Sequence, residues 1–148
     1  MTMKLLQIIL ILSTIAFSCD SEDDMSPAGM DMVMDMLPDD IGPIGMGTFT
    51  SYAHNLAGKA ILLTDDAGKR VVRLEDFTMT SGPDVYVFIS KSNNYSQANV
   101  IEVAKLTAGY TDSDINFEFD TSAYTSDYKF VLVYCIQFNS LFGYAELK

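Results

Sequence analysis

The segment Tyr128–Phe138, with the sequence YKFVLVYCIQF, is the longest apolar run in the second half of the chain. Its even-numbered positions are apolar, and so are the odd-numbered positions at its centre, Val131, Val133 and Cys135. Side chains alternate between the two faces of a strand, so apolar residues at both sets of positions indicate a strand that is covered on both sides. The segment therefore predicts a central strand that directs the thiol of Cys135 into a packed layer.

Shorter apolar runs on either side predict further strands, because turn residues separate them. These runs are Lys59–Thr64, Arg70–Leu74, Val85–Ser90, Val100–Leu106, the alternating stretch Ile115–Phe119, and Tyr144–Leu147. The first two flank residues 65–68 and predict a hairpin with a four-residue loop. For Val100–Leu106 a short helix is the alternative. Many short strands without a long amphipathic helix predict an all-β fold, either a small β-sandwich or a barrel-like domain.

The amino-terminal residues have the pattern of a secretory leader. Lys4 supplies positive charge ahead of the apolar run Leu5–Phe17, which is shorter than the roughly 20 residues that a spanning helix needs. The run ends in Ala16-Phe17-Ser18-Cys19, which resembles a lipobox, the motif at which a bacterial lipoprotein is acylated and cleaved. We therefore predict a lipoprotein signal peptide over residues 1–18 and lipidation of Cys19. An ordinary signal peptide with an incidental cysteine is the alternative.

Residues 19–46 are predicted to form an acidic linker that is rich in Met, Pro and Gly, and residues 47–148 the folded domain. Prolines, glycines and acidic residues in the linker predict disorder, because they cannot bury enough apolar surface to offset the entropy of ordering. The acidic run Asp20–Asp24 is similar to the surface-export signal of certain Gram-negative lipoproteins. We therefore expect a lipid anchor in the outer membrane and a surface-exposed domain. A solvated spacer is the alternative interpretation of the acidic run.

Two compositional features concern ligands. The net charge of −11, from 20 acidic and 9 basic residues, argues against a nucleic-acid partner, whose binding requires Lys and Arg to neutralise phosphates. The linker also contains a Met-x-Met repeat whose soft thioether ligands suit Cu(I). The repeat consists of Met30, Met32, Met34 and Met36. A compositionally biased linker without copper is the alternative.

Several short motifs occur in the order seen in a known family. They are Gly47-Thr48-Phe49, His54, Gly58-Lys59-Ala60, Leu74-Glu75-Asp76-Phe77, Gly82-Pro83-Asp84-Val85-Tyr86-Val87, Tyr134-Cys135-x-x-Phe138 and Phe142-Gly143-Tyr144-Ala145-Glu146-Leu147. Over Gly47–Lys148 the chain resembles the DM-thirteen domain family, small extracytoplasmic domains proposed to act in electron transfer. The resemblance implies a β-rich fold and one characteristic cysteine, which is Cys135 here. In that family the cysteine is suggested to act as a bare thiol or as a ligand to a prosthetic group such as haem. The segment Ala108–Phe119 departs from the family pattern.

Cys135 has two interpretations. If Cys19 is acylated, Cys135 lacks a disulfide partner within the chain, which is unusual outside the cytoplasm. It is either a redox thiol or cofactor ligand, as the resemblance implies, or a small hydrophobic residue of the core. A reactive thiol needs a cation, a helix N-terminus or a metal beside it, and its sequence neighbours Tyr134 and Ile136 provide none of these.

His54 is the only histidine and is the candidate second ligand of a haem, opposite Cys135 or a methionine. A hydrogen-bonded loop histidine is the alternative. The sequence lacks Cys-x-x-Cys-His, which excludes covalent c-type haem, and it has no cluster of ligands that predicts a zinc site. Asp112, Asp114 and Asn116 imitate the start of a calcium loop, but the glycine and glutamate that such a loop requires are missing.

Two function classes follow from these residues. The first is a lipid-anchored, extracytoplasmic electron-transfer module centred on Cys135, with an unidentified redox partner. The second is a non-catalytic cell-surface domain for binding or adhesion, with a glycan or a protein as its ligand. Either module fits better than a stand-alone enzyme, because no motif for hydrolytic chemistry surrounds Cys135 or His54.

Overall fold

The computed structural model describes residues 42–148. Several predictions therefore lie outside the described residues. These are the signal peptide over residues 1–18, the lipidation of Cys19, nearly all of the linker, and the Cu(I) site at Met30, Met32, Met34 and Met36.

The described part of the chain consists of eight β-strands and one short 3-10 helix. They are β1 (Gly45–Ser51), β2 (Leu56–Thr64), β3 (Arg70–Met79), β4 (Val85–Ser90), η1 (Gln97–Asn99), β5 (Val100–Leu106), β6 (Tyr110–Glu118), β7 (Phe130–Cys135) and β8 (Ser140–Glu146). The all-β prediction is confirmed. Within residues 42–148 no helix is long and apolar enough to cross a membrane.

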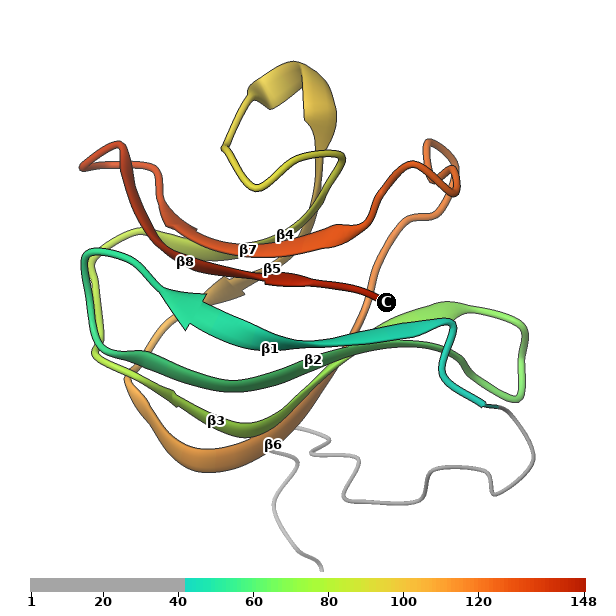
Figure 1. Ribbon diagram of the computed structural model, residues 1–148, viewed down its shortest axis with the longest axis horizontal. Helices are drawn as coiled ribbons and strands as arrows, with labels where there is room; N and C mark the ends of the chain where they lie inside the picture. Colours follow the sequence, from blue (N-terminus) through green and yellow to red (C-terminus); the bar gives the residue numbers. More distant parts are fainter. Residues whose placement is uncertain (1–41) are drawn as a thin grey trace, which may run out of the picture. The chain divides into compact units, whose positions relative to one another are not determined.

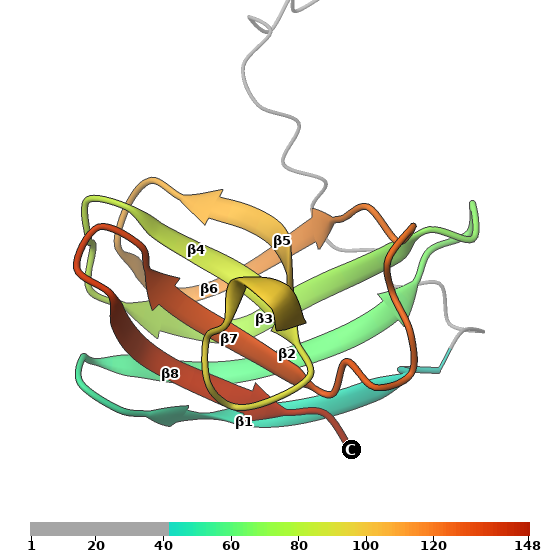
Figure 2. The same cartoon turned by 90° about the horizontal axis from the view of Figure 1, so that it is seen from above.

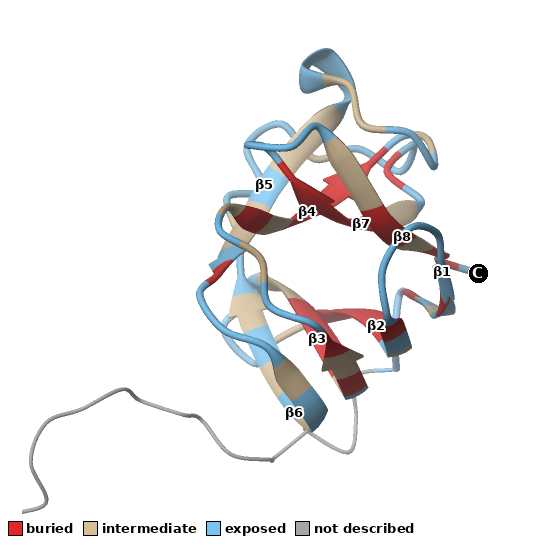
Figure 3. Ribbon diagram, turned by 90° about the vertical axis from the view of Figure 1, so that its left-hand side faces the viewer, coloured by how far each residue is buried: buried red, intermediate tan, exposed pale blue. Residues whose placement is uncertain are grey.

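All eight strands belong to one antiparallel sheet, in the order β5-β4-β7-β8-β1-β2-β3-β6. The sheet curls so that its two edge strands, β5 and β6, approach each other without backbone pairing between them (Figures 1 and 2). Seen along the barrel, buried residues lie on the strands β2, β3, β4 and β7, whereas β6 is mostly exposed or partly buried (Figure 3). The chain thus adopts the barrel-like form of the predicted fold, with one open seam.

Strand β7 lies between β4 and β8 and is buried throughout Val131–Cys135. The inward residues Val131, Val133 and Cys135 belong to the main core. The outward residues Leu132 and Tyr134 belong to a second apolar cluster on the other face of the sheet. The prediction of a central strand covered on both faces is confirmed.

The strand ends earlier than the apolar run predicts. Residues 136–139 form a turn to β8, closed by a hydrogen bond of 3.2 Å from the amide of Asn139 to the carbonyl of Ile136. Asn139 has φ +48°, a left-handed conformation that asparagine tolerates better than most residues. The ring of Phe138 is therefore 66% exposed instead of buried in the strand.

The other predicted strands are present, but β3 extends to Met79, β6 begins at Tyr110, and β1 was not predicted. The hairpin of β2 and β3 is confirmed, although five residues separate the strands instead of four. Val85–Ser90 and Val100–Leu106 are strands with the predicted limits, so the helix alternative for the second is wrong. The last strand is longer than predicted, because it begins at Ser140 and includes Gly143.

Four loops gather at the end of the barrel that lies on the left in Figure 1 and faces the viewer in Figure 3. They connect β1 to β2 (residues 52–55), β3 to β4 (80–84), β5 to β6 (107–109) and β7 to β8 (136–139). Because β7 runs toward this end, its last residue, Cys135, lies directly beneath these loops. We call these four loops the thiol end.

Strands β1 and β8 pack closely where they pair, and glycine makes this possible. A Cβ at Gly143 would lie 2.3 Å from the carbonyl oxygen of Thr50 and 2.6 Å from Cδ2 of Leu56. A Cβ at Gly47 would lie 2.1 Å from the carbonyl oxygen of Glu146. Glycine in a strand often marks such a close approach of another backbone.

We expect Gly143→Ala to lower the free energy of unfolding by at least about 1–3 kcal/mol, the usual cost of overpacking a filled site. Urea unfolding followed by tyrosine fluorescence measures the change. Gly42→Ala is the matched control, because a Cβ there meets no atom within 4 Å. Equal unfolding midpoints for the two variants would show that the β1–β8 contact is looser than described.

Candidate functional site

Cys135 is the free cysteine of the described chain and is 1% exposed. Its Cα pairs with that of Val85 on β4 and with that of Ser140 on β8. The side chain belongs to the main apolar core. The thiol is therefore enclosed at the last position of β7, directly below the thiol end.

His54 lies in the β1–β2 loop at the same end of the barrel. Its ring stacks on that of Phe142, with centroids 3.9 Å apart and planes inclined by 26°. Its Nε2 is 3.2 Å from Oγ of Ser140, and the hydroxyl of Ser51 donates a hydrogen bond to its carbonyl oxygen. Ser140 thus connects the two predicted site residues, because it is bonded to His54 and is paired with Cys135.

This packing does not fit a haem bound by both residues. His54 is exposed and covers Phe142, which is 4% exposed and shares the main core with Cys135. One face of the imidazole stacks on Phe142 and its Nε2 contacts Ser140, so an iron bound there would have to break these contacts. Among residues 42–148, moreover, no group of three or more His, Cys, Asp or Glu side chains is arranged to hold a metal ion.

The surface of the thiol end carries little charge. Asp84 is the only Asp, Glu, Lys or Arg in its four loops, and Nζ of Lys105 lies 2.6 Å from its carboxylate. That hydrogen bond is the largest cause that raises the pKa of Lys105 above its usual value. Three large apolar side chains are exposed here, Tyr52 at 76%, Phe138 at 66% and Ile136 at 40%.

On the outer face of the sheet, Tyr134 stacks on Tyr95 with centroids 4.1 Å apart and planes inclined by 10°. Tyr134 is 6% exposed, and its hydroxyl donates a hydrogen bond to the side-chain oxygen of Asn139. Burial, and then the neighbouring Tyr95 and Cys135, raise the pKa of the Tyr134 phenol. The sequence offered no signal for this pair, because Tyr95 comes from the polar loop between β4 and β5 and meets Tyr134 only in the fold.

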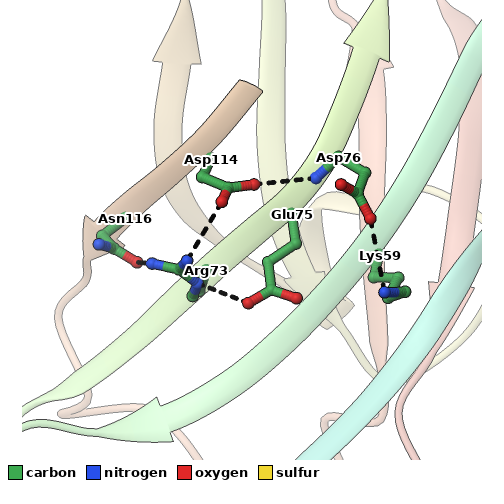
Figure 4. A network of polar contacts seen from close by, with 6 residues as sticks. All are labelled: Lys59, Arg73, Glu75, Asp76, Asp114 and Asn116. Carbon is green, nitrogen blue, oxygen red and sulfur yellow. Dashed lines mark hydrogen bonds and ion pairs between the residues drawn. The ribbon is translucent and has the colours of Figure 1, made fainter. Parts of the chain in front are cut away.

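The acidic residues of β6 that imitate a calcium loop have a structural role instead (Figure 4). Arg73 of β3 is 4% exposed. Its guanidinium bonds to Glu75 at 2.8 Å, Asp114 at 3.3 Å and Asn116 at 3.5 Å. Asp114 also accepts a hydrogen bond of 3.0 Å from the backbone amide of Asp76, which has φ +50°. These groups hold β6 to an irregular part of β3.

Comparison with known protein families identifies the domain. The family model described as "Electron transfer DM13" matches residues 48–147. The chain belongs to the DM13 family. The match spans β2 to β8 and most of β1, and it includes His54, Tyr95, Tyr134 and Cys135. No curated protein and no solved structure matches the chain.

The DM13 assignment confirms the resemblance on which the site prediction rests. The family description is electron transfer, which suggests an electron-transfer role for this domain.

We expect His54→Ala to raise the rate at which Cys135 reacts with a thiol reagent in the folded protein. The variant loses the ring that covers Phe142 and the bond to Ser140. Loss of about 1 kcal/mol of local stability corresponds to a rate increase of about fivefold when the reagent reaches the thiol by local opening. The measurement is made in a Cys19→Ser background, where Cys135 is the only thiol.

Tyr52→Ala is the control for this measurement, because the ring belongs to the same loop but is 76% exposed. It should leave the labelling rate near that of the parent chain. If His54→Ala labels as slowly as Tyr52→Ala, His54 does not cover the route to the thiol.

Proposed function

We propose that the protein is a lipid-anchored, extracytoplasmic electron-transfer domain whose redox group is the thiol of Cys135. The membership of the DM13 family supports the electron-transfer part. The position of the free cysteine carries the proposal further, because Cys135 lies one residue from the loops of an end that is uncharged apart from one ion pair.

The burial of Cys135 favours single-electron exchange over thiol–disulfide exchange. Disulfide exchange requires one sulfur to attack another directly, which a thiol that is 1% exposed cannot do in the folded domain. An electron, in contrast, can cross the thin layer of protein between Cys135 and a partner at the thiol end. The thiol then loses one electron to a strong one-electron oxidant that the partner carries, and it releases its proton. Reduction of the thiyl radical returns the electron and the proton to Cys135.

The partner is expected to approach the thiol end. Exposed apolar side chains and a nearly neutral surface suit a contact with a similarly uncharged patch, since like charges are not brought together there. The same end contains Ser140 and His54, a hydroxyl and an imidazole joined by a hydrogen bond of 3.2 Å. Imidazole is a common proton carrier near neutral pH, and Ser140 is paired with Cys135, so this pair is a candidate route for the proton of the thiol.

Non-catalytic binding is the second candidate, and the exposed side chains of Tyr52, Ile136 and Phe138 favour it. In that case the thiol end contacts a protein or glycan ligand, and Cys135 only fills the core. The two candidates differ in what Cys135→Ala should change, because a binding domain keeps its function without the thiol.

We expect oxidation of the full chain with photogenerated tris(bipyridyl)ruthenium(III) to produce a sulfur-centred radical, and Cys135→Ala to abolish it. Electron paramagnetic resonance of samples frozen at short times distinguishes this radical from a tyrosyl radical. Cys19→Ser serves as the control and should keep the signal. Identical spectra from Cys135→Ala and the parent chain would contradict the redox role of Cys135 and favour the binding function.

We expect Cys19→Ser to release the protein from the membrane fraction of the cells that produce it. A single acyl chain gives only marginal membrane binding, so stable anchoring depends on the several chains of a processed lipoprotein. Fractionation without detergent, followed by immunodetection, measures the distribution. Persistent membrane association of the variant would contradict the lipid anchor but would leave the redox proposal untouched.

A further inference from the structure

The stacked tyrosines lie on the opposite face of the sheet from the thiol that they adjoin. Tyr134 and Cys135 are consecutive residues of β7, so their side chains point to opposite faces. The thiol belongs to the main core and the phenol ring to the outer cluster. Tyr134 is thus one peptide unit from the thiol on one side and 4.1 Å, between ring centroids, from Tyr95 on the other.

The position of Tyr95 extends this arrangement toward solvent. Tyr95 lies in the loop between β4 and β5, which folds over the outer face of the sheet, and its ring is only partly buried. The edge of Phe88 packs against it, with centroids 5.1 Å apart. A nearly parallel ring pair therefore runs from the residue beside Cys135 to the partly buried ring of Tyr95 on the outer face of the sheet.

We propose that Tyr134 and Tyr95 form a second electron route, which connects Cys135 to the outer face of the sheet. The proposal rests on the redox role of Cys135 given above. A domain that passes electrons onward must receive them from one partner and deliver them to another. The thiol end provides one contact, and the tyrosine pair provides the other on a different surface.

A one-electron oxidant at the outer face, such as a ruthenium(III) complex, removes one electron from Tyr95, whose phenolic proton passes to water. Cys135 then supplies one electron through Tyr134, loses its thiol proton and becomes a thiyl radical. Tyr95 recovers its electron and takes a proton from water. In total, one electron moves from the thiol to the oxidant and one proton moves from the thiol to water.

Packing alone does not require hydroxyl groups in this stack. Phenylalanine has the same ring, yet Tyr134 carries a phenol into a place where it is 6% exposed and needs the side chain of Asn139 as its hydrogen-bond partner. A buried hydroxyl costs free energy unless it is bonded. Tyr→Phe variants therefore keep the ring contact and remove the phenol that the electron route needs.

The test follows the tyrosyl radical by transient absorption after flash oxidation of the full chain with tris(bipyridyl)ruthenium(II) and a cobalt(III) quencher. A Tyr52→Phe background removes the most exposed of the described tyrosines, and Tyr95→Phe identifies the part of the signal that Tyr95 contributes. In the parent chain the tyrosyl radical decays quickly, because Cys135 reduces it by donating one electron. In Tyr134→Phe its lifetime should increase at least about tenfold, which corresponds to about 1.4 kcal/mol of barrier. Cys135→Ala should show the same increase.

Tyr144→Phe is the matched control, because Tyr144 belongs to the same outer cluster but is not stacked on Tyr134 or Tyr95. Its radical lifetime should equal that of the parent chain. If Cys135→Ala prolongs the lifetime and Tyr134→Phe does not, the tyrosine route is refuted while Cys135 keeps its redox role. If Cys135→Ala leaves the lifetime unchanged, the redox role of Cys135 itself is refuted.

Discussion

The burial of β7 on both faces is the constraint on which this barrel depends. Its inward residues complete the main core, and its outward residues need a second apolar layer. A curled sheet encloses only its inner face, so the outer face of β7 must be covered by something else. Tyr95 and the loop that carries it supply this cover, together with aromatic residues of β4 and β8. The burial of β7 on both faces therefore accounts for both the enclosed thiol and the stacked tyrosines.

The sequence predicted the strands well, since their signals are local. Alternation around Ile115 and Phe117 indicates a half-buried strand, and the turn residues before Val85 mark where β4 begins. The limit of β7 was missed, because the apolar residues Ile136 and Phe138 continue the pattern although a turn exposes them. The sequence could not distinguish a sandwich from a barrel. The difference depends on how far the whole sheet curls, and no single segment carries that information.

The site was predictable only in part, and for a related reason. Cys135 and His54 stand out in the sequence because each type of side chain is rare there, and the fold brings both to one end. Their connection through Ser140 and Phe142 depends on the register between β7 and β8. It also depends on where the β1–β2 loop places His54. The Tyr95–Tyr134 stack joins a polar loop to a central strand. Contacts of this kind combine residues that are far apart in the chain and have no shared pattern.

The open seam between β5 and β6 bears on how the domain behaves when many copies are close together. Each seam strand has one row of backbone groups without a strand partner in the described chain, which is a template for association with another molecule. Both strands carry features that oppose such association. Val103 of β5 is an extra residue that interrupts its pairing with β4, and Glu102 and Lys105 place opposite charges along the strand. In β6 the register is irregular, and Asp112, Asp114 and Glu118 add negative charge. Edge-to-edge aggregation is therefore disfavoured even at high local concentration.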